Sequence, residues 1–572
     1  MCGIYCYIGK KKALPIITTG LTTLEYRGYD SAGIAYIKNN KVNIIKEKGK
    51  LENLKKLLNN NEKTYIAIGH TRWSTHGKAD KINAHPHKQG NITIVHNGII
   101  ENYKELKNEL VEYNLKSETD TEILCCLIDK LYKENNNIIK VLSKLKNIVK
   151  GSYALGLIID DNLNSIYAIK KNSPLILAKS NIGNFIASDI PAILNYTNKY
   201  ILLENDEFAK LTKDDITIYD EDGNNINKKT NTYEQSLIAS SKNNYEHFML
   251  KEIYEQPDVF YNTINAINEL PDLTKYNKIH IVGCGSAYHA GLVGKYLIEK
   301  YKNIEVQVEL ASEYRYKKVF YDKKNLVIFI SQSGETADTL ACVKKVKEDN
   351  IDTLGIVNVI SSSIAREVDK VIYTKAGCEI AVATTKAYTA QITILSMLAN
   401  KNISNISNLM NDILNNDYLK IAKLLYKSNN IFFIGRGIDY ALAMEGSLKL
   451  KEISYINTQA YSAGELKHGT ISLIDDNSYI IAINTNKELS EKTISNIKET
   501  QARGAKVIYI TTKELEQEFL DYDEIIVLPN TLEHLQPILT IIPLQLIAYE
   551  VAKLKGCDID KPKNLAKSVT VE

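Results

Sequence analysis

The sequence predicts an α+β sandwich of two antiparallel sheets with helices outside, followed by two α/β subdomains with parallel sheets. Short strand-like runs separated by turns fill the chain to about residue 228. Apolar runs that alternate with long helical segments follow, and this second pattern repeats at an offset of roughly 150 residues. We therefore expect a first domain at 1–228, a polar linker at 229–243, and subdomains at 244–405 and 406–572.

The first domain alternates strand and helix patterns. The predicted strands lie at 2–9, 31–40, 64–73, 91–100, 151–160, 165–173 and 183–189. Helices with apolar residues at three- and four-residue spacing are predicted at 16–25, 101–112 and 120–132. A mixture of this kind is typical of an α+β sandwich.

The second part of the chain carries an internal repeat. KIHIVGCGSAYHAG near residue 280 is echoed by NIFFIGRGIDYALA near residue 432, and NLVIFIS is echoed by NSYIIAINT. The repeat is too long for one unit of a solenoid, which indicates duplication of a whole α/β subdomain. Alternating apolar strands and helices predict parallel sheets covered on both faces.

Composition narrows the classes of protein. The 44% hydrophobic content is ample for several cores. A net charge of +3 gives no large positive potential that would attract nucleic acid or a membrane surface. Eight cysteines without a CxxC pair indicate reduced thiols. No apolar stretch approaches the roughly 20 residues that span a bilayer, and no secretory signal pattern begins the chain. We expect a cytoplasmic protein.

Cys2 is a candidate nucleophile. If Met1 is removed, Cys2 carries both a thiol and a free α-amine. An α-amine with a pKa of about 7.7 to 8.0 can take the proton of the attacking thiol, so no histidine base is needed. By itself, however, a small residue at position two also serves simply to permit methionine removal.

The segment SQSGETADT at 331–339 predicts an anion site. A buried strand delivers hydroxyls and backbone N–H groups to the start of a helix, where the helix dipole favours negative charge. The absence of GxxxxGK[ST] favours a phosphosugar over a nucleoside triphosphate, and an ordinary capping box is the alternative. The glycine turns at 283–285 and 435–437 lack the third glycine of a dinucleotide fingerprint.

Together these motifs resemble known families. SQSGET on a duplicated α/β unit resembles a SIS phosphosugar-binding domain. The N-terminal CGI with RGYDSAGIA, HTRWSTHG, NAHPH, HNGIIEN and SETDTE resembles a class II glutamine amidotransferase of the N-terminal-nucleophile type. In that order, and with the terminal LAKSVTVE, the whole chain resembles the glutamine:fructose-6-phosphate aminotransferase family.

The resemblance implies roles in the first domain. Cys2 would attack the side-chain amide of glutamine, and Asn97 with the backbone N–H of Gly98 would form the oxyanion hole. Arg72 would clamp the glutamine carboxylate through two parallel hydrogen bonds. Asp120 would pair with the glutamine ammonium.

Trp73 and several histidines also belong to this expected site. The histidines are His70, His76, His85, His87 and His96. Their spacing does not match a zinc framework, so we expect hydrogen bonding and positioning rather than metal ligation. His76 would line the glutamine pocket, and Trp73 matches a gate between two active sites.

Roles in the second half follow from the same resemblance. Glu445, Lys449 and Glu452 share one helical face. The resemblance makes Glu452 the group that moves a proton between sugar carbons one and two, with Lys449 close by. His468 would assist ring opening from the neighbouring subunit, which implies at least a dimer, and Lys567 would form a Schiff base with the open-chain ketose.

The resemblance also predicts a set of sugar-phosphate contacts, with some departures from the family pattern. The predicted contacts are Ser286, Ser331, Gln332, Ser333, Thr336, Val382 and Thr384. Ala287 stands where many relatives have a serine, and Thr384 stands where serine is usual. We expect weaker phosphate binding rather than a different substrate.

The implied reaction turns glutamine and fructose 6-phosphate into glutamate and glucosamine 6-phosphate, without metal, ATP or another cofactor. Ammonia would have to cross a dry passage, with Trp73 and the C-terminal tail as candidate walls. Two alternatives stay open: a glutamine-linked sugar-phosphate deglycase, and a non-catalytic phosphosugar sensor. An intact Cys2 and Lys567 speak against the sensor.

Overall fold

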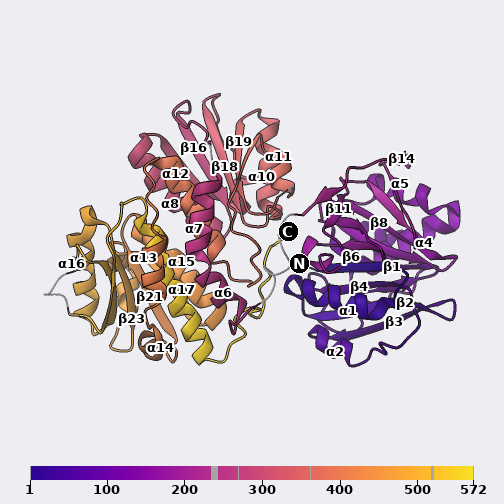
Figure 1. Ribbon diagram of the computed structural model, residues 1–572, viewed down its shortest axis with the longest axis horizontal. Coiled ribbons are helices and arrows are strands. Elements are labelled where there is room, and N and C mark those ends of the chain that lie inside the picture. Colours follow the sequence, from indigo (N-terminus) through magenta and orange to yellow (C-terminus); the bar gives the residue numbers. More distant parts are fainter. Residues whose placement is uncertain (1, 234–241, 268, 361, 517–520, 571–572) are drawn as a thin grey trace. The chain divides into compact units, whose positions relative to one another are not determined.

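The computed structural model describes residues 2–233, 242–267, 269–360, 362–516 and 521–570. The chain divides into two compact units. Unit 1 comprises Met1–Ser240 and Ser568–Glu572, and unit 2 comprises Ser241–Lys567 (Figure 1). Met1, residues 234–241 of the predicted linker and the last two residues of the LAKSVTVE motif lie outside the described residues.

Unit 1 contains two antiparallel sheets, as predicted. The eight-stranded sheet has the order β15-β11-β9-β10-β1-β4-β2-β3, and the seven-stranded sheet has the order β14-β13-β12-β8-β7-β6-β5. The strands of the first sheet are β1 Gly3–Gly9, β2 Ser31–Lys38, β3 Lys41–Lys48, β4 Ile66–Arg72, β9 Ile176–Lys179, β10 Gly183–Ala187, β11 Lys199–Leu202 and β15 Asn231–Thr232. Those of the second are β5 His87–Gln89, β6 Ile92–Ile100, β7 Gly151–Ile159, β8 Asn162–Lys171, β12 Phe208–Leu211, β13 Ile216–Tyr219 and β14 Asn225–Ile226.

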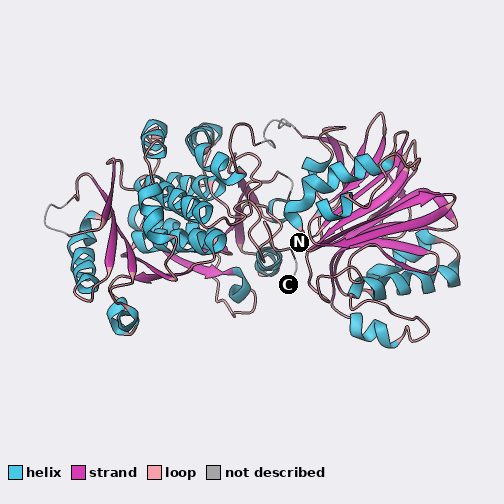
Figure 2. Cartoon of the chain, turned by 90° about the horizontal axis from the view of Figure 1, so that it is seen from below, coloured by secondary structure: helices cyan, strands magenta, loops and turns pink. Residues whose placement is uncertain are grey.

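Helices cover both outer faces of this sandwich (Figure 2). They are α1 Ala13–Leu24, α2 Leu51–Lys55, α3 Tyr103–Asn108, α4 Asp120–Asn135 and α5 Ile138–Ile148. The helix predicted at 101–112 is shorter in the structure, where it is α3. The predicted linker contains the short strand β15, which pairs with β11.

The central strand β1 explains how the first residues of the chain are held. It pairs with β10 on one side and β4 on the other, and every residue in it is buried. Tyr5 and Tyr7 face the core under α1, whereas Ile4 and Cys6 face the core between the sheets. A one-residue slip of β1 would exchange these two sets of side chains between the two cores, so the register is fixed and Cys2 starts from a rigid element.

Unit 2 contains two parallel sheets with the same strand order, as the internal repeat predicts. The first is β17-β16-β18-β19-β20 and the second is β22-β21-β23-β24-β25. Their strands are β16 Lys278–Gly283, β17 Glu305–Leu310, β18 Asn325–Ser331, β19 Asp352–Val357, β20 Lys370–Tyr373, β21 Asn430–Gly435, β22 Asn457–Ser462, β23 Tyr479–Asn484, β24 Lys506–Thr512 and β25 Glu524–Leu528.

The helices of unit 2 pack on these sheets and on one another. They are α6 Phe248–Tyr254, α7 Gln256–Ala266, α8 Ser286–Lys302, α9 Ala311–Tyr314, α10 Ala337–Glu348, α11 Ser363–Glu367, α12 Lys386–Ala399, α13 Ser407–Leu414, α14 Leu419–Leu425, α15 Ile438–Ser454, α16 Ser490–Gln501 and α17 Gln536–Leu554. Helix α8 contacts both α12 and α15, and one apolar core runs through both repeats. The two predicted subdomains therefore form one compact unit.

Helix α17 is a long apolar helix of unit 2. By length and composition it is able to cross a membrane, which the sequence analysis did not anticipate, but 83% of its most apolar window is buried inside unit 2. It packs against α15 and α14. Its hydrophobicity is explained by its place in the core.

The strand order predicts a ligand crevice in the first repeat. The chain leaves β16 for β17 on one side, and it returns to β18 on the other. At such a reversal point the loops beyond the strand ends diverge and leave space for a ligand. The loop after β18 is the SQSGET segment, which leads into α10 as predicted.

Candidate functional site

Cys2 lines a cavity in unit 1 together with three of the predicted residues, Trp73, Asn97 and Gly98. Its Sγ accepts a hydrogen bond from the backbone N–H of Trp73 at 3.2 Å. Burial raises the pKa of the Cys2 thiol. The resting group is thus a thiol, and it needs a nearby base before it can attack. Thr570, from the C-terminal tail, also lines this cavity.

The backbone of Cys2 is fixed by two side chains. Arg27 Nε donates to the carbonyl oxygen of Cys2 at 3.1 Å, and Asn97 Nδ2 donates to the same oxygen at 3.0 Å. Arg27 in turn pairs with Asp189 at 3.3 Å. The sequence analysis did not assign roles to Arg27 and Asp189, although Arg27 begins the quoted motif RGYDSAGIA and Asp189 ends a predicted strand.

Asn97 and Gly98 lie together at the predicted oxyanion position. The Asn97 amide also donates to Ser188 Oγ at 2.9 Å, so a substrate oxygen would have to take over one of its two hydrogen bonds. Gly98 has φ +136°, and a Cβ at this position would lie 2.0 Å from the carbonyl oxygen of Ser152. Only glycine fits there.

Arg72 is buried at the end of β4 and holds the loop that follows it. Its Nη1 donates to Ser74 Oγ at 3.0 Å and to the carbonyl oxygen of Lys78 at 3.1 Å. Its Nη2 contacts the carbonyl oxygens of His76 and Gly77. A glutamine carboxylate would have to displace some of these acceptors from Arg72.

Asp120, His76 and Trp73 occupy distinct surroundings. Asp120 is the first residue of α4, and its Oδ2 accepts a hydrogen bond at 2.9 Å from the N–H of Ile100, two residues after Gly98. The His76 ring packs edge-on against Tyr103 with ring centroids 5.0 Å apart. Trp73 makes the same kind of contact with Tyr29 at 5.6 Å.

The other histidines form a buried cluster beneath this site. His70 and His85 stack at 4.1 Å, and His70 Nε2 lies 2.9 Å from the His96 carbonyl oxygen and 3.0 Å from Asn97 Oδ1. Both of these are acceptors, so Nε2 carries the hydrogen. Burial lowers the pKa of His70 to about 3. Within the described residues no group of three or more His, Cys, Asp or Glu side chains is arranged to hold a metal ion.

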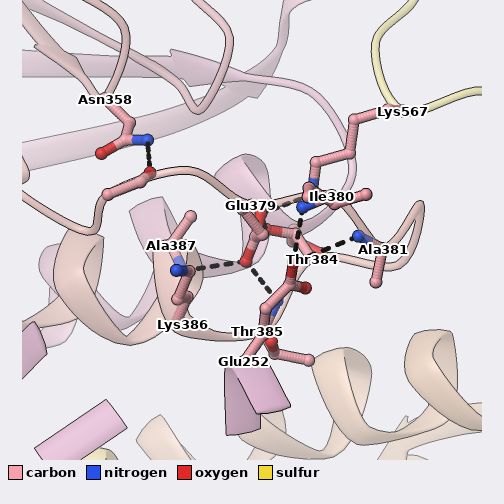
Figure 3. Close-up of polar contacts among 12 residues, drawn as sticks. Glu252, Asn358, Glu379, Ile380, Ala381, Thr384, Thr385, Lys386, Ala387 and Lys567 are labelled. Atoms are coloured by element: carbon pink, nitrogen blue, oxygen red, sulfur yellow. Dashed lines mark hydrogen bonds and ion pairs between the residues drawn. The ribbon is translucent and has the colours of Figure 1, made fainter. Parts of the chain in front are cut away.

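In unit 2, Lys567 meets a buried carboxylate that the sequence analysis did not single out. Lys567 Nζ lies 2.5 Å from Glu379 Oε2 (Figure 3). Thr384 Oγ1 donates to the same oxygen at 2.6 Å. The sequence signal for Glu379 is that it is the single acidic residue in the segment AGCEIAVATTK. A glutamate is rarely buried unless its charge is paired.

The predicted acid-base residues lie together on α15. Lys449 is buried and lies 2.7 Å from Glu452 and 3.4 Å from Glu445. Burial would lower the pKa of Lys449, but the two carboxylates outweigh burial and raise it, so the amine is charged. The charge of Glu379 acts in the same direction, which connects this group to the surroundings of Lys567.

Ser286, a predicted phosphate contact, connects the two repeats through a hydrogen bond of its hydroxyl group. Its Oγ donates to Glu445 Oε1 at 2.8 Å, and His289 Nδ1 lies 2.8 Å from the other oxygen of Glu445. The first turn of α8 is thereby tied to α15. A phosphate would compete with Glu445 for the Ser286 hydroxyl.

The SQSGET loop closes on itself through short contacts. Ser331 Oγ lies 3.0 Å from Thr336 Oγ1 and accepts a hydrogen bond from the N–H of Gly334 at 3.0 Å. Ser333 Oγ accepts from the N–H of Glu335 at 3.2 Å. The hydroxyls and N–H groups thus lie close together ahead of α10, where an anion cradle is predicted.

Two further contacts connect this loop to the surroundings of Lys567. The Gln332 carbonyl oxygen accepts from the N–H of Asn358, and the Asn358 amide donates to the carbonyl oxygen of Gly377 at 2.7 Å. Gly377 precedes Glu379 by two residues, and Val382 follows in the same segment. Figure 3 shows Asn358 and Lys567 around this segment.

His468 is not brought to these groups within the described part of unit 2. It lies in the short helix η4 (Leu466–His468) and is exposed.

Comparison with known proteins gives matches along the whole chain. The SIS domain family matches residues 272–401 and 424–555, and the glutamine amidotransferase domain family matches residues 70–195. Curated glutamine–fructose-6-phosphate aminotransferases [isomerizing] from Caldanaerobacter subterraneus subsp. tengcongensis, Clostridium acetobutylicum and Aquifex aeolicus are 48%, 46% and 43% identical. In each case the match covers 100% of both chains.

A solved structure matches the second part of the chain. It is the C-terminal domain of glucosamine-fructose-6-phosphate aminotransferase from Francisella tularensis, with 39% identity and a TM-score of 0.52. The match covers 56% of this chain and 99% of that structure.

Proposed function

The chain belongs to the family of isomerizing glutamine–fructose-6-phosphate aminotransferases, and from this membership we propose how its residues divide the reaction. Its function is to transfer ammonia from glutamine to fructose 6-phosphate and to isomerise the product to glucosamine 6-phosphate, releasing glutamate. This is the entry step to the hexosamines. Unit 1 supplies the ammonia, and unit 2 carries out the sugar chemistry.

In unit 1 we assign the attack on glutamine to Cys2. Its thiol forms a γ-glutamyl thioester and releases ammonia, after which water hydrolyses the thioester to glutamate. The α-amine that Met1 removal exposes is the base. The Gly98 N–H and the Asn97 amide stabilise the tetrahedral oxyanion, at the cost of one of the hydrogen bonds that Asn97 makes now.

Arg72, Asp120, His76 and Trp73 are the proposed substrate contacts of unit 1. Arg72 is a planar donor that exchanges loop carbonyls for the glutamine carboxylate. Asp120 pairs with the ammonium, and the rings of His76 and Trp73 line the pocket. Release of the Arg72 contacts on binding would let the loop at 74–78 adjust to the substrate.

In unit 2 the sugar phosphate is proposed to bind in the SQSGET cradle. The set comprises Ser286, Ser331, Gln332, Ser333, Thr336, Val382 and Thr384. Lys567 forms a Schiff base with carbon two of the open-chain ketose, and ammonia then replaces it. Glu452 moves a proton between carbons one and two, with Lys449 holding its carboxylate at 2.7 Å.

The proposal extends to assembly and location. Exposed His468 opens the sugar ring of a neighbouring subunit, so the working enzyme is a homodimer. The enzyme acts in the cytoplasm. A passage for ammonia from Cys2 to Lys567 stays a prediction.

One observation supports these roles: the groups proposed for each reaction lie together in one unit. Cys2 lines a cavity with Asn97 and Gly98 in unit 1, and Lys567 lies beside a buried carboxylate in unit 2. The test is incubation with glutamine and fructose 6-phosphate while glucosamine 6-phosphate and glutamate are both measured. A ratio near one supports coupled transfer. Glutamate without amino sugar would contradict it.

A further inference from the structure

We propose that Glu379 is a catalytic proton-transfer residue of the sugar reaction. It takes a proton from Nζ of Lys567 and returns it to the oxygen that leaves carbon two of the sugar. The inference deepens the proposed function, because it rests on Lys567 as the lysine that forms the Schiff base.

The geometry holds Glu379 against Lys567. Nζ and Oε2 are 2.5 Å apart, and the side chains of Lys567 and Glu379 are 5% and 0% exposed. Glu379 cannot rotate away, because its Oε1 accepts from the N–H groups of Thr385 at 2.9 Å and Ala387 at 3.1 Å. Thr384 Oγ1 donates to Oε2. The carboxylate is therefore fixed before any substrate binds (Figure 3).

An amine must lose its proton before it attacks a carbonyl group, and this amine is screened from water. The Lys567 side chain is 5% exposed, so bulk solvent has little access to Nζ as a proton acceptor. Among the described residues, Nζ of Lys567 contacts the carboxylate of Glu379. Glu379 is thus in place to act as the acceptor.

Charged groups from several elements face this pair. They are Glu252 on α6, Lys386 on α12 and Lys449 on α15, and Glu255, between α6 and α7, acts on Lys386. Burial raises the pKa of Glu379, but the charge of Lys567 and the hydrogen bonds from Lys567, Thr384 and Thr385 together outweigh burial and hold this pKa below its usual range. Burial and the charge of Glu379 raise the pKa of Glu252 to about 8. At neutral pH Glu379 is therefore the ionised member of the two carboxyl groups.

Glu252 also stabilises the segment that carries Glu379. Its Oε1 accepts from the N–H groups of Ile380 and of Ala381, the latter at 3.2 Å. Glu255 pairs with Lys386 at 2.7 Å and with Lys251 at 3.5 Å. Because Glu252 is mostly protonated at neutral pH, Glu379 is the carboxylate that faces Lys567, and it can accept the single proton that has to move.

The proton balance closes without another reactant. Lys567 gives one of its three Nζ protons to Glu379, and the neutral amine forms a bond to carbon two while the carbonyl electrons move to oxygen. A second proton passes from nitrogen to that oxygen. Glu379 then gives its proton to the hydroxyl group, the carbon–oxygen bond breaks, and water leaves. The nitrogen lone pair forms the iminium, and Glu379 is again a carboxylate beside it.

The first test measures Schiff-base formation directly. Enzyme and fructose 6-phosphate are mixed, borohydride reduces the imine, and mass spectrometry measures the rate at which the Lys567 peptide gains the sugar. We expect Glu379→Gln to slow this rate by about 100-fold or more, the range of general acid-base catalysis. Glu379→Asp, which keeps the carboxylate, should recover part of it. Glutamine hydrolysis in unit 1 should be unchanged.

Asp439→Asn is the matched control. Asp439 is a buried carboxylate of unit 2 that accepts from the N–H groups of Thr485 at 2.8 Å and Asn486 at 3.1 Å. It has no place in the proposed chemistry. We expect Asp439→Asn to change the thermal midpoint by about as much as Glu379→Gln does, while its rate of sugar trapping at Lys567 stays at the wild-type value. This result would separate a catalytic loss from a general effect of removing a buried charge.

A second measurement needs no variant and decides the question if Glu379→Gln does not fold. The trapping rate of the native enzyme is followed from pH 5.5 to 7, at least one unit below the pKa of about 8 of Glu252. Transfer inside the pair leaves its total proton number constant, so we expect a flat profile. An amine that had to lose its proton to solvent would gain about 30-fold over this range.

The outcomes separate this inference from the proposed function. No trapping at Lys567 in the wild-type enzyme would overturn the assignment of the Schiff-base lysine. Trapping in the wild type with an equal rate in folded Glu379→Gln, or a 30-fold rise with pH, would overturn the role of Glu379 and leave the proposed function intact.

Discussion

Asn97 Nδ2 donates a hydrogen bond to the carbonyl oxygen of Cys2 at 3.0 Å, and this bond joins the second residue of the chain to β6. Arg27 donates to the same oxygen at 3.1 Å. The two donors come from separate elements and converge on one backbone atom. They set the direction in which Cys2 presents its Sγ.

Asn97→Ala should therefore lose both the anchor of Cys2 and the oxyanion donor. We expect the rate of glutamine hydrolysis to fall by about 100- to 1,000-fold, the usual effect of removing one oxyanion donor. Isomerisation of the sugar phosphate in unit 2 should stay near the wild-type rate. A parallel loss of both activities would show that Asn97 acts on the whole fold.

Cys2→Ala should abolish glutamine-dependent synthesis, because no other residue is proposed to attack the amide. Isomerisation of the sugar phosphate in unit 2 should survive. Cys557→Ala, which removes a partly buried thiol of unit 2, is the control and should change neither activity. Equal loss of both reactions in Cys2→Ala would contradict the division of labour between the two units.

Gly98→Ala should destabilise unit 1. The φ of +136° is unfavourable for alanine, and the added Cβ would meet the Ser152 carbonyl oxygen at 2.0 Å. We expect a loss of about 3 kcal/mol or more in the free energy of unfolding, measured by urea denaturation. Gly556→Ala also has a positive φ, of +65°, but no atom within 4 Å, so its loss should be clearly smaller.

The buried histidines should make the stability of unit 1 sensitive to acid. Burial lowers the pKa of His70 from 6.5 to about 3, so between these values the unfolded chain binds a proton that the folded chain does not. Stability is then fully present above pH 6.5 and is lost as the pH falls. For His70 alone the loss from pH 6.5 to 5 is about 2 kcal/mol.

His85→Asn tests this dependence, because burial also lowers the pKa of His85. Its Nδ1 accepts from the N–H of His96, and an asparagine oxygen can accept the same bond without titrating. Urea midpoints at pH 7, 6 and 5 should fall less steeply in the variant than in the wild type. Identical slopes would rule out His85 as a source of the acid sensitivity.

Lys449→Met should leave Glu445 and Glu452 without their shared cation. Breaking a buried ion pair from one side costs about 3–5 kcal/mol, and we expect a loss of this size in the urea unfolding of unit 2. Lys451→Met, on the exposed face of the same helix, should stay within about 0.5 kcal/mol of wild type. Similar losses in the two variants would show that helix propensity, rather than the buried charge, sets the effect.

Much of the architecture could be predicted from local sequence. Period-two alternation and turn residues located β1, β2, β4, β6, β7, β8 and β10, because these strands carry enough apolar residues to show the pattern. The short edge strands, such as β14 and β15, were not predicted. A strand of two residues is too short to show an alternating pattern. Strands β14 and β15 form because the neighbouring strands β13 and β11 supply hydrogen bonds.

The sequence by itself determined the order of the two functional halves, the internal repeat and the position of the SQSGET loop, since each depends on residues close together in the chain. Only the tertiary structure decided which side chains meet. Arg27 reaches Cys2 across 25 positions, and Lys567 reaches Glu379 across 188. Such pairs leave no local periodicity, because burial and charge compensation act between segments that only folding brings together.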